Sequence, residues 1–208
     1  MRRLFLLTIC LLSVGAACGR NLHVYLIGDS TCATKELAKQ NPERGWGQLF
    51  RPLFDGSVTD CNHAANGRST KSFRDEGRWK AVCDELRAGD YVFIQFGHND
   101  QKQADSTRYA APVQYAANLR RYVAETREKG AVPVLLTPVV RRRFTGDALD
   151  DTYGPYAAAV RRVAAEEGVV LIDAERLTRA WVSSLGDEAS KAYYMWVAPG
   201  TNPRWPDG

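Results

Sequence analysis

Continuous apolar runs alternate along the chain with segments in which apolar residues recur at helical spacing. Most of the runs end at Gly, Asp or Pro and are apolar on both faces, which is typical of strands buried inside a sheet. Alternating strands and helices predict an α/β fold with a parallel sheet covered on both sides. The expected strands cover residues 22–27, 57–61, 91–96, 132–137 and 169–172. The expected helices cover residues 45–54, 70–86, 115–128, 156–167 and 174–185.

Polar residues gather where the predicted strands end. Residues 29–30 follow the first strand, 66–67 the second, 97–100 the third and 141–143 the fourth. The carboxyl ends of parallel strands lie at one edge of a sheet, and ligands of open α/β sheets bind beyond that edge. We therefore expect four segments that are far apart in the sequence to form a single site.

The composition is that of one globular domain. The chain has 208 residues, of which 45% are hydrophobic and 25% are charged, so global disorder and fibrous repeats are excluded. The formal net charge is +4, and it falls to about +2 if the first residues, with Arg2 and Arg3, are removed. So small an excess argues against a nucleic-acid binder.

The first residues predict an export signal over 1–17. A positive start precedes an almost unbroken apolar run that ends in small residues and is too short to span a bilayer comfortably. A buried first strand or helix fits less well, because the run has no polar face. We expect a secreted or periplasmic protein whose domain covers residues 21–208 and has no membrane span. A surface lipoprotein with a lipid anchor at Cys18 is the alternative.

The cysteines show no metal-ligand pattern. Cys18, Cys32, Cys61 and Cys83 are irregularly spaced, without a Cys-x-x-Cys or a Cys/His arrangement, so we expect no metal site. An oxidising compartment would permit a disulfide, and buried free thiols are the simpler interpretation.

Three residues at the expected edge suit acyl transfer. Ser30 leaves the first strand at a tight turn, and attack on an ester needs an exposed hydroxyl, a base and donors for the oxyanion. Gly67 lets its backbone N–H approach a substrate oxygen, and Asn99 offers a neutral amide donor. Each has a structural alternative, namely a helix cap, an Asn-Gly turn and an Asx turn respectively. The chain has no Gly-x-Ser-x-Gly, so an α/β-hydrolase elbow is not supported.

Five sequence blocks occur in one order along the chain. They are Gly28-Asp29-Ser30-Thr31, Gly45-Trp46-Gly47-Gln48, Ala65-Asn66-Gly67-Arg68-Ser69-Thr70, Gln95-Phe96-Gly97-His98-Asn99-Asp100 and Tyr194-Met195-Trp196-Val197. Together they resemble the SGNH (GDSL) hydrolase superfamily, and most nearly its bacterial rhamnogalacturonan acetylesterase-like proteins. The resemblance implies a three-layer α/β/α sandwich without metal or cofactor. It also implies that Ser30 is the nucleophile, and that the N–H groups of Ser30 and Gly67 form an oxyanion hole with the Asn99 side chain.

One part of the family pattern is absent from the sequence. The family carries its catalytic aspartate and histidine in an Asp-x-x-His block near the C-terminus, and this sequence has no histidine after His98. The three histidines are His23 and His63, expected in or beside strands, and His98, expected in a structural or substrate-facing role. We expect a chain truncated before its last block, with apolar surface left uncovered. It should have little esterase activity, because loss of triad members costs about 10⁴- to 10⁶-fold.

The resemblance implies an acetylated plant polysaccharide, rhamnogalacturonan-like pectin, as the substrate. Arg141 and Arg142 could hold the carboxylate of an acidic sugar, and a solvated run paired with nearby aspartates is the alternative. We place Asp29 with these arginines among the substrate-binding residues. Two other classes stay open: a non-catalytic carbohydrate-binding pseudoenzyme on the same fold, and a flavodoxin-like cofactor binder. The second is disfavoured because no glycine-rich phosphate loop occurs.

Overall fold

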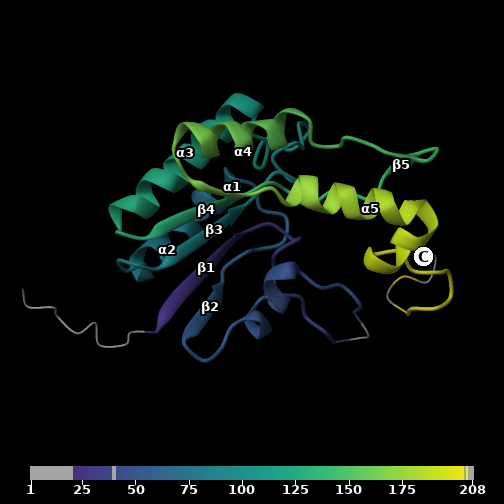
Figure 1. The fold of residues 1–208 in the computed structure, drawn as a ribbon, viewed down its shortest axis with the longest axis horizontal. Helices are drawn as coiled ribbons and strands as arrows, with labels where there is room; N and C mark the ends of the chain where they lie inside the picture. Colours follow the sequence, from purple (N-terminus) through teal and green to yellow (C-terminus); the bar gives the residue numbers. More distant parts are fainter. Residues whose placement is uncertain (1–20, 39–40, 204, 206–208) are drawn as a thin grey trace, which may run out of the picture.

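Five parallel strands form a sheet in the order β2-β1-β3-β4-β7 (Figure 1). The structure is a computed structural model and describes residues 21–38, 41–203 and 205. The predicted leader over 1–17 and Cys18 lie outside the described residues and stay predictions. All five expected strands and their parallel pairing are confirmed. They are β1 (Leu22–Gly28), β2 (Val58–Asn62), β3 (Tyr91–Gln95), β4 (Val132–Leu136) and β7 (Val170–Ile172).

The direction of the connections decides which face of the sheet each helix covers. β2 lies on one side of β1, whereas the later strands β3, β4 and β7 follow one another on its other side. Because crossovers are right-handed, the two sets of connections lie on opposite faces. The second set packs as one apolar cluster against the sheet. Its helices are α1 (Ser72–Asp75), α2 (Arg78–Glu85), α3 (Pro112–Glu128) and α4 (Pro155–Glu166).

The first connection covers the other face with two short 3₁₀ helices, η1 (Trp46–Leu49) and η2 (Arg51–Leu53). Trp46 and Phe50 pack there beside Leu26 of β1. The chain reverses its direction of travel between β1 and β3, and such a switch point is where open parallel sheets bind ligands. The fold therefore directs attention to the carboxyl ends of β1 and β3.

Two predicted helices differ from those observed. The segment 45–54 forms 3₁₀ turns, and Pro52 in η2 has no N–H to continue an α-helical ladder. The segment 70–86 is divided into α1 and α2 at Gly77, whose φ of 72° lies in the left-handed region. Apolar spacing alone extends across this break, because α1 and α2 bury apolar side chains in the same cluster.

The last part of the chain runs beyond the carboxyl edge of the sheet, where α5 lies (Figure 1). A two-stranded antiparallel hairpin in the long polar connection was not predicted from the sequence. Gly186, with φ 73° and ψ 178°, interrupts the last helix. Several apolar side chains here are exposed, including those of Leu177 and Trp181. The remaining elements are β5 (Phe144–Thr145), β6 (Ala148–Leu149), α5 (Ala174–Ser190) and η3 (Lys191–Tyr193).

Two negative findings apply to the part of the chain that the structure describes. None of its helices is long and apolar enough to cross a membrane. Cys32, Cys61 and Cys83 are free thiols, and Cys32 is buried.

Gly45 holds the η1 segment against the loop that carries Ser30. A Cβ at this position would lie 2.1 Å from the carbonyl oxygen of Ala33 and 2.7 Å from that of Cys32. We expect Gly45→Ala to lower the free energy of unfolding by about 3 kcal/mol, because backbone atoms cannot make room cheaply. Gly56→Ala is the matched control, since nothing lies within 4 Å of its Cβ. Equal urea midpoints for the two variants would show that this packing is loose.

Candidate active site

Four chain segments meet at the carboxyl edge of the sheet, as the sequence predicts. They follow β1, β2, β3 and β4, and each is tied to a neighbour by a hydrogen bond. The N–H of Ala65 donates to the Gly28 carbonyl (3.0 Å), the Asn99 amide to the Arg68 carbonyl (2.9 Å), and the Arg141 guanidinium to the His98 carbonyl (3.3 Å). The loops that carry Ser30, Gly67 and Asn99 are therefore neighbours.

Ser30 lies in the turn that ends β1. A Cβ on Gly28 would lie 2.5 Å from the Gln95 carbonyl oxygen, so a glycine is needed where β1 closes on β3. The turn is shaped by Asp29, whose carboxylate accepts hydrogen bonds from the N–H (2.9 Å) and hydroxyl (2.8 Å) of Thr31. Ser30 itself is half-buried. Among the described residues no side chain is hydrogen-bonded to its hydroxyl, which leaves Oγ available to a ligand and without a base.

Three N–H donors near Ser30 have no acceptor elsewhere in the described structure. The backbone N–H groups of Ser30 and Gly67 make no hydrogen bond there, and Gly67 is held at φ 76°, which favours glycine. Asn99 is buried and uses one amide hydrogen on the Arg68 carbonyl. A primary amide has two hydrogens, so the second remains free while the first fixes the orientation of the group. These donors are of the kind that stabilise an oxyanion.

His98 is the histidine at this edge, and both of its ring nitrogens face protein groups. Nδ1 lies 3.4 Å from Oδ2 of the fully buried Asp29, and neither atom has another partner in the described chain. Nε2 contacts the hydroxyl of Tyr153. Burial raises the pKa of Tyr153, so its hydroxyl stays protonated beside Nε2. His98 thus joins the loop of Ser30 to that of Asn99 and has no free nitrogen for Ser30.

Asp29 is ionised because of these contacts. Burial alone would raise its pKa, but the hydrogen bond and charge of His98 and the two bonds from Thr31 hold the pKa below its usual value. Its carboxylate is fully buried, so it orients Thr31 and His98. Direct contact of Asp29 with substrate stays a prediction that this buried position does not favour.

The rings of the other two histidines are held by groups other than Ser30. His23 Nδ1 is 3.7 Å from Asp90, which precedes β3 at the amino edge of the sheet. His63 stacks on Tyr25, and burial lowers its pKa. Neither is placed to take a proton from Ser30.

Asp100 ties the glycine-containing loop to the asparagine loop. It is fully buried, and its Oδ1 accepts hydrogen bonds from the N–H (3.0 Å) and hydroxyl (2.5 Å) of Thr70. Burial raises the pKa of Asp100 to about 7, despite these bonds, and the nearby Asp29 carboxylate acts in the same direction. In the sequence, Asp100 stands out only as part of a motif. Its burial depends on the fold and could not be predicted from the sequence.

This raised pKa predicts a pH dependence of stability. The folded chain holds the Asp100 proton more tightly than the unfolded chain, whose carboxyl titrates near 3.8, so this contribution to stability is lost as pH rises from about 4 to about 7. Asp100→Asn keeps an acceptor for Thr70 and removes the charge. We expect the melting temperature of Asp100→Asn, relative to that of the wild type, to increase as the pH rises from 5 to 8. An unchanged difference between the two proteins across that range would contradict the assignment.

Arg141 and Arg142 lie near the nucleophile loop but differ in how their charge is used. Arg141 donates to the Gln101 side chain (2.9 Å), its guanidinium lies 4.5 Å from the Tyr153 ring centroid, and no described carboxylate pairs with it. Arg142 is paired with Asp187. Both line a cavity of about 330 Å³ that also includes Thr31 and His98. Their roles in substrate binding stay predictions, and Arg141 has the freer charge.

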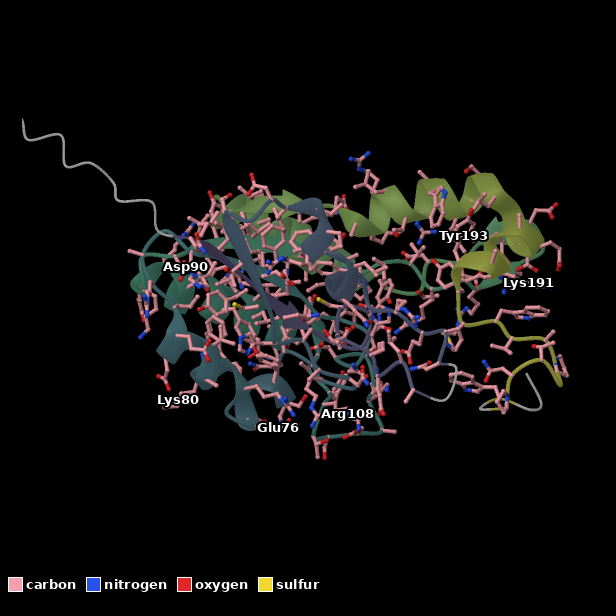
Figure 2. The ribbon with its side chains drawn as sticks, turned by 90° about the horizontal axis from the view of Figure 1, so that it is seen from below. Glu76, Lys80, Asp90, Arg108, Lys191 and Tyr193 are labelled. Atoms are coloured by element: carbon pink, nitrogen blue, oxygen red, sulfur yellow. The ribbon has the colours of Figure 1, made fainter. Side chains whose placement is uncertain are left out.

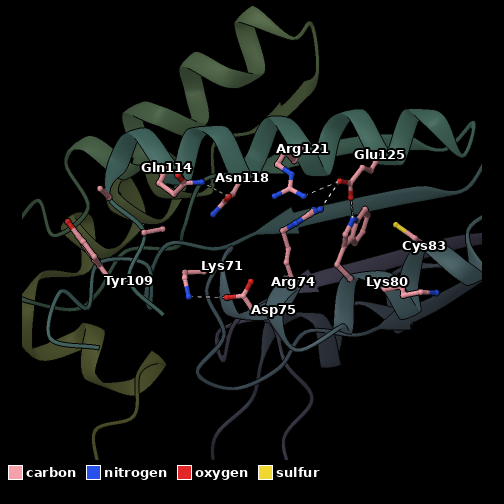
Figure 3. Close-up of a pocket in the computed structure, with 13 residues that line it drawn as sticks. Lys71, Arg74, Asp75, Lys80, Cys83, Tyr109, Gln114, Asn118, Arg121 and Glu125 are labelled. Carbon is pink, nitrogen blue, oxygen red and sulfur yellow. Dashed lines mark hydrogen bonds and ion pairs between the residues drawn. The ribbon is translucent and has the colours of Figure 1, made fainter. Parts of the chain in front are cut away.

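A larger cavity of about 720 Å³ lies elsewhere, between α1 and α2 on one side and α3 on the other (Figure 3). Two of its cations are paired within it, Arg74 with Glu125 (2.6 Å) and Lys71 with Asp75 (2.9 Å). None of the three predicted catalytic residues lines it. The described residues also hold no group of three or more His, Cys, Asp or Glu side chains arranged to bind a metal.

Comparison with known proteins agrees with this geometry. The GDSL-like Lipase/Acylhydrolase family matches residues 26–197. The chain is 40% identical over 191 residues to rhamnogalacturonan acetylesterase RhgT of Bacillus subtilis (strain 168), covering 90% of this chain and 79% of that protein. It is 36% identical over 181 residues to the probable rhamnogalacturonan acetylesterase YesY of the same strain, covering 86% and 82%.

Solved structures show the same fold. Protein YxiM of Bacillus subtilis has a TM-score of 0.76 and 27% identity, covering 85% of this chain and 50% of that one. Axe2, an acetylxylan esterase from Geobacillus stearothermophilus, has a TM-score of 0.66 and 20% identity, covering 86% and 85%. Two further structures of that esterase are of catalytic mutants, in which an aspartate or the histidine three positions after it is replaced by alanine.

Proposed function

Because this chain belongs to the GDSL-like lipase/acylhydrolase family, we propose that it removes acetyl groups from an acetylated plant cell-wall polysaccharide of the rhamnogalacturonan type. The family is one of carboxylic ester hydrolases, and two relatives that this chain covers by about four fifths are named rhamnogalacturonan acetylesterases. The observation that carries the proposal is that the loop of the unpartnered Ser30 hydroxyl adjoins the loops of Gly67 and Asn99, which hold free N–H donors.

The proposed chemistry is acyl transfer through Ser30. Its Oγ attacks the acetyl carbonyl carbon, and the negative charge on the carbonyl oxygen is held by the N–H groups of Ser30 and Gly67 and the free amide hydrogen of Asn99. The ester C–O bond breaks, the sugar hydroxyl leaves with a proton, and acetyl remains on Ser30. Water then releases acetate and restores the hydroxyl.

The step with no residue assigned to it is removal of the Ser30 proton. Asp60 and His63 have Asp-x-x-His spacing, but the His63 ring stacks on Tyr25 and Asp60 is paired with Arg51. His98 has both nitrogens engaged. We therefore propose that the 208 residues hold the nucleophile and the oxyanion hole without the general base. Activity of the chain is then limited by that proton transfer.

Chemical rescue tests this proposal. Acetylated rhamnogalacturonan oligosaccharides are incubated with the chain and with Ser30→Ala, each with and without imidazole, and free acetate is measured. Imidazole should raise the serine-dependent rate at least about tenfold, since a positioned base is worth about 10²–10⁴ and a diffusing one less. Ser30→Ala should show no such gain.

The second candidate is a non-catalytic carbohydrate-binding protein on the same fold, favoured by the lack of a base near Ser30. Binding of the oligosaccharides without any serine-dependent acetate release, even with imidazole, would support it and contradict the esterase proposal.

A further inference from the structure

A cavity of about 680 Å³, called the outer cavity below, adjoins the cavity of about 330 Å³ that Arg141 and Arg142 line. Tyr194, Met195 and Trp196 line both cavities. One cavity reaches Thr31 beside the nucleophile. Figure 2 shows Lys191 and Tyr193, which line the outer cavity, at the end of the molecule away from Asp90. The outer cavity is thus linked through residues 194–196 to the cavity that includes Thr31, the neighbour of Ser30.

The outer cavity is lined by unusually exposed aromatic side chains. Tyr193 is 60% exposed and Trp196 is 50% exposed. Lys191 Nζ lies over one face of the Trp196 ring, 4.7 Å from its centroid. Large apolar rings on a protein surface mark binding grooves, and a flat ring suits the C–H face of a sugar.

The same cavity carries a positive charge that the described residues do not neutralise. Arg44 is exposed, and its guanidinium donates only to the backbone carbonyls of Asn41 and Glu43, both at 2.8 Å. The neighbouring carboxylate of Glu43 is already paired with the buried Lys35 at 2.7 Å. Arg44 can therefore accept a carboxylate from a ligand, and guanidinium binds carboxylates with two parallel hydrogen bonds.

We propose that the outer cavity is a subsite for a uronate sugar of the substrate chain, with the sugar ring on Trp196 and its carboxylate on Arg44. The inference rests on the proposed function and adds a substrate preference to it. An acidic chain places a carboxylate at Arg44, whereas a neutral xylan-type chain has none to offer. Acidic polysaccharides should therefore bind more tightly than neutral ones.

Calorimetric titration tests the subsite without depending on catalysis. Deacetylated rhamnogalacturonan oligosaccharides are titrated into the 208-residue chain, Arg44→Ala and Trp196→Ala. We expect the dissociation constant to rise about tenfold or more in each variant, as for loss of a charged hydrogen bond. Neutral xylo-oligosaccharides should bind more weakly and be unaffected by Arg44→Ala.

Two matched controls separate the subsite from general surface effects. Arg87→Ala removes an exposed arginine at the amino edge, and Val113→Ala truncates an apolar side chain that is 81% exposed and lines neither cavity. Both should bind as the wild type does. The inference is overturned if the wild type fails to bind, or if Arg44→Ala and Trp196→Ala bind normally. The inference is also overturned if sedimentation shows that Trp196→Ala weakens binding only by dissociating a dimer. Binding with no serine-dependent acetate release, even with imidazole, would overturn the proposed function alone.

Discussion

The 208-residue chain should turn over acetyl esters about 10⁴- to 10⁶-fold more slowly than an esterase with a complete triad. A serine hydroxyl is a weak nucleophile until a base removes its proton. His23 faces Asp90 at the amino edge, and the ring of His63 stacks on Tyr25. The nitrogens of His98 face Asp29 and Tyr153. The oxyanion donors alone leave a small residual rate.

Hydrolysis of p-nitrophenyl acetate by the chain, with Ser30→Ala as the control, measures this rate. Ordinary enzymes turn over at about 1–10³ s⁻¹, so serine-dependent turnover above about 1 s⁻¹ would contradict the account. His98→Ala would then show whether His98 leaves its partners to act as the base.

Asn99→Ala should lower the serine-dependent, imidazole-assisted rate by about 10²- to 10³-fold, the loss typical of one oxyanion donor. The substitution removes the free amide hydrogen that faces the developing charge. Its effect should fall on kcat with KM little changed, because the charge exists only in the transition state.

Asn66→Ala serves as the control for Asn99→Ala. Asn66 precedes Gly67 on the same edge, but its side chain is exposed and its Oδ1 accepts from Lys35 at 2.7 Å. We expect it to change the rate only a few-fold. Similar losses in both variants, or a rise in KM alone for Asn99→Ala, would remove Asn99 from the oxyanion hole. Thermal unfolding checks that each variant is folded.

The sequence predicts the site's framework because strand ends are local signals. Buried runs that stop at Gly28, Gln95 and Leu136 place polar residues at one edge whenever the sheet is parallel, and pairing of β1 with β3 then brings Ser30 and Asn99 together. Helix lengths were less predictable. At Gly77 the apolar pattern continues through a left-handed residue, so spacing alone shows no break.

Contacts made by the long polar connection could not be predicted. Tyr153 follows the β5–β6 hairpin, and nothing near it in sequence indicates that its hydroxyl meets His98 or that Arg141 lies on its ring. The sequence likewise does not show that the Arg44 guanidinium lacks a carboxylate partner, because this depends on Lys35 pairing with the neighbouring Glu43. Such features depend on which partners the fold supplies.

A crystal structure of the chain with phenylboronic acid bound tests the central claim most directly. Boron bonded to Ser30 Oγ imitates the tetrahedral intermediate. The account predicts one boronate oxygen about 2.7–3.1 Å from the backbone nitrogens of Ser30 and Gly67 and from Asn99 Nδ2. A boronate oxygen turned away from Asn99, or boron bonded to a residue other than Ser30, would contradict it.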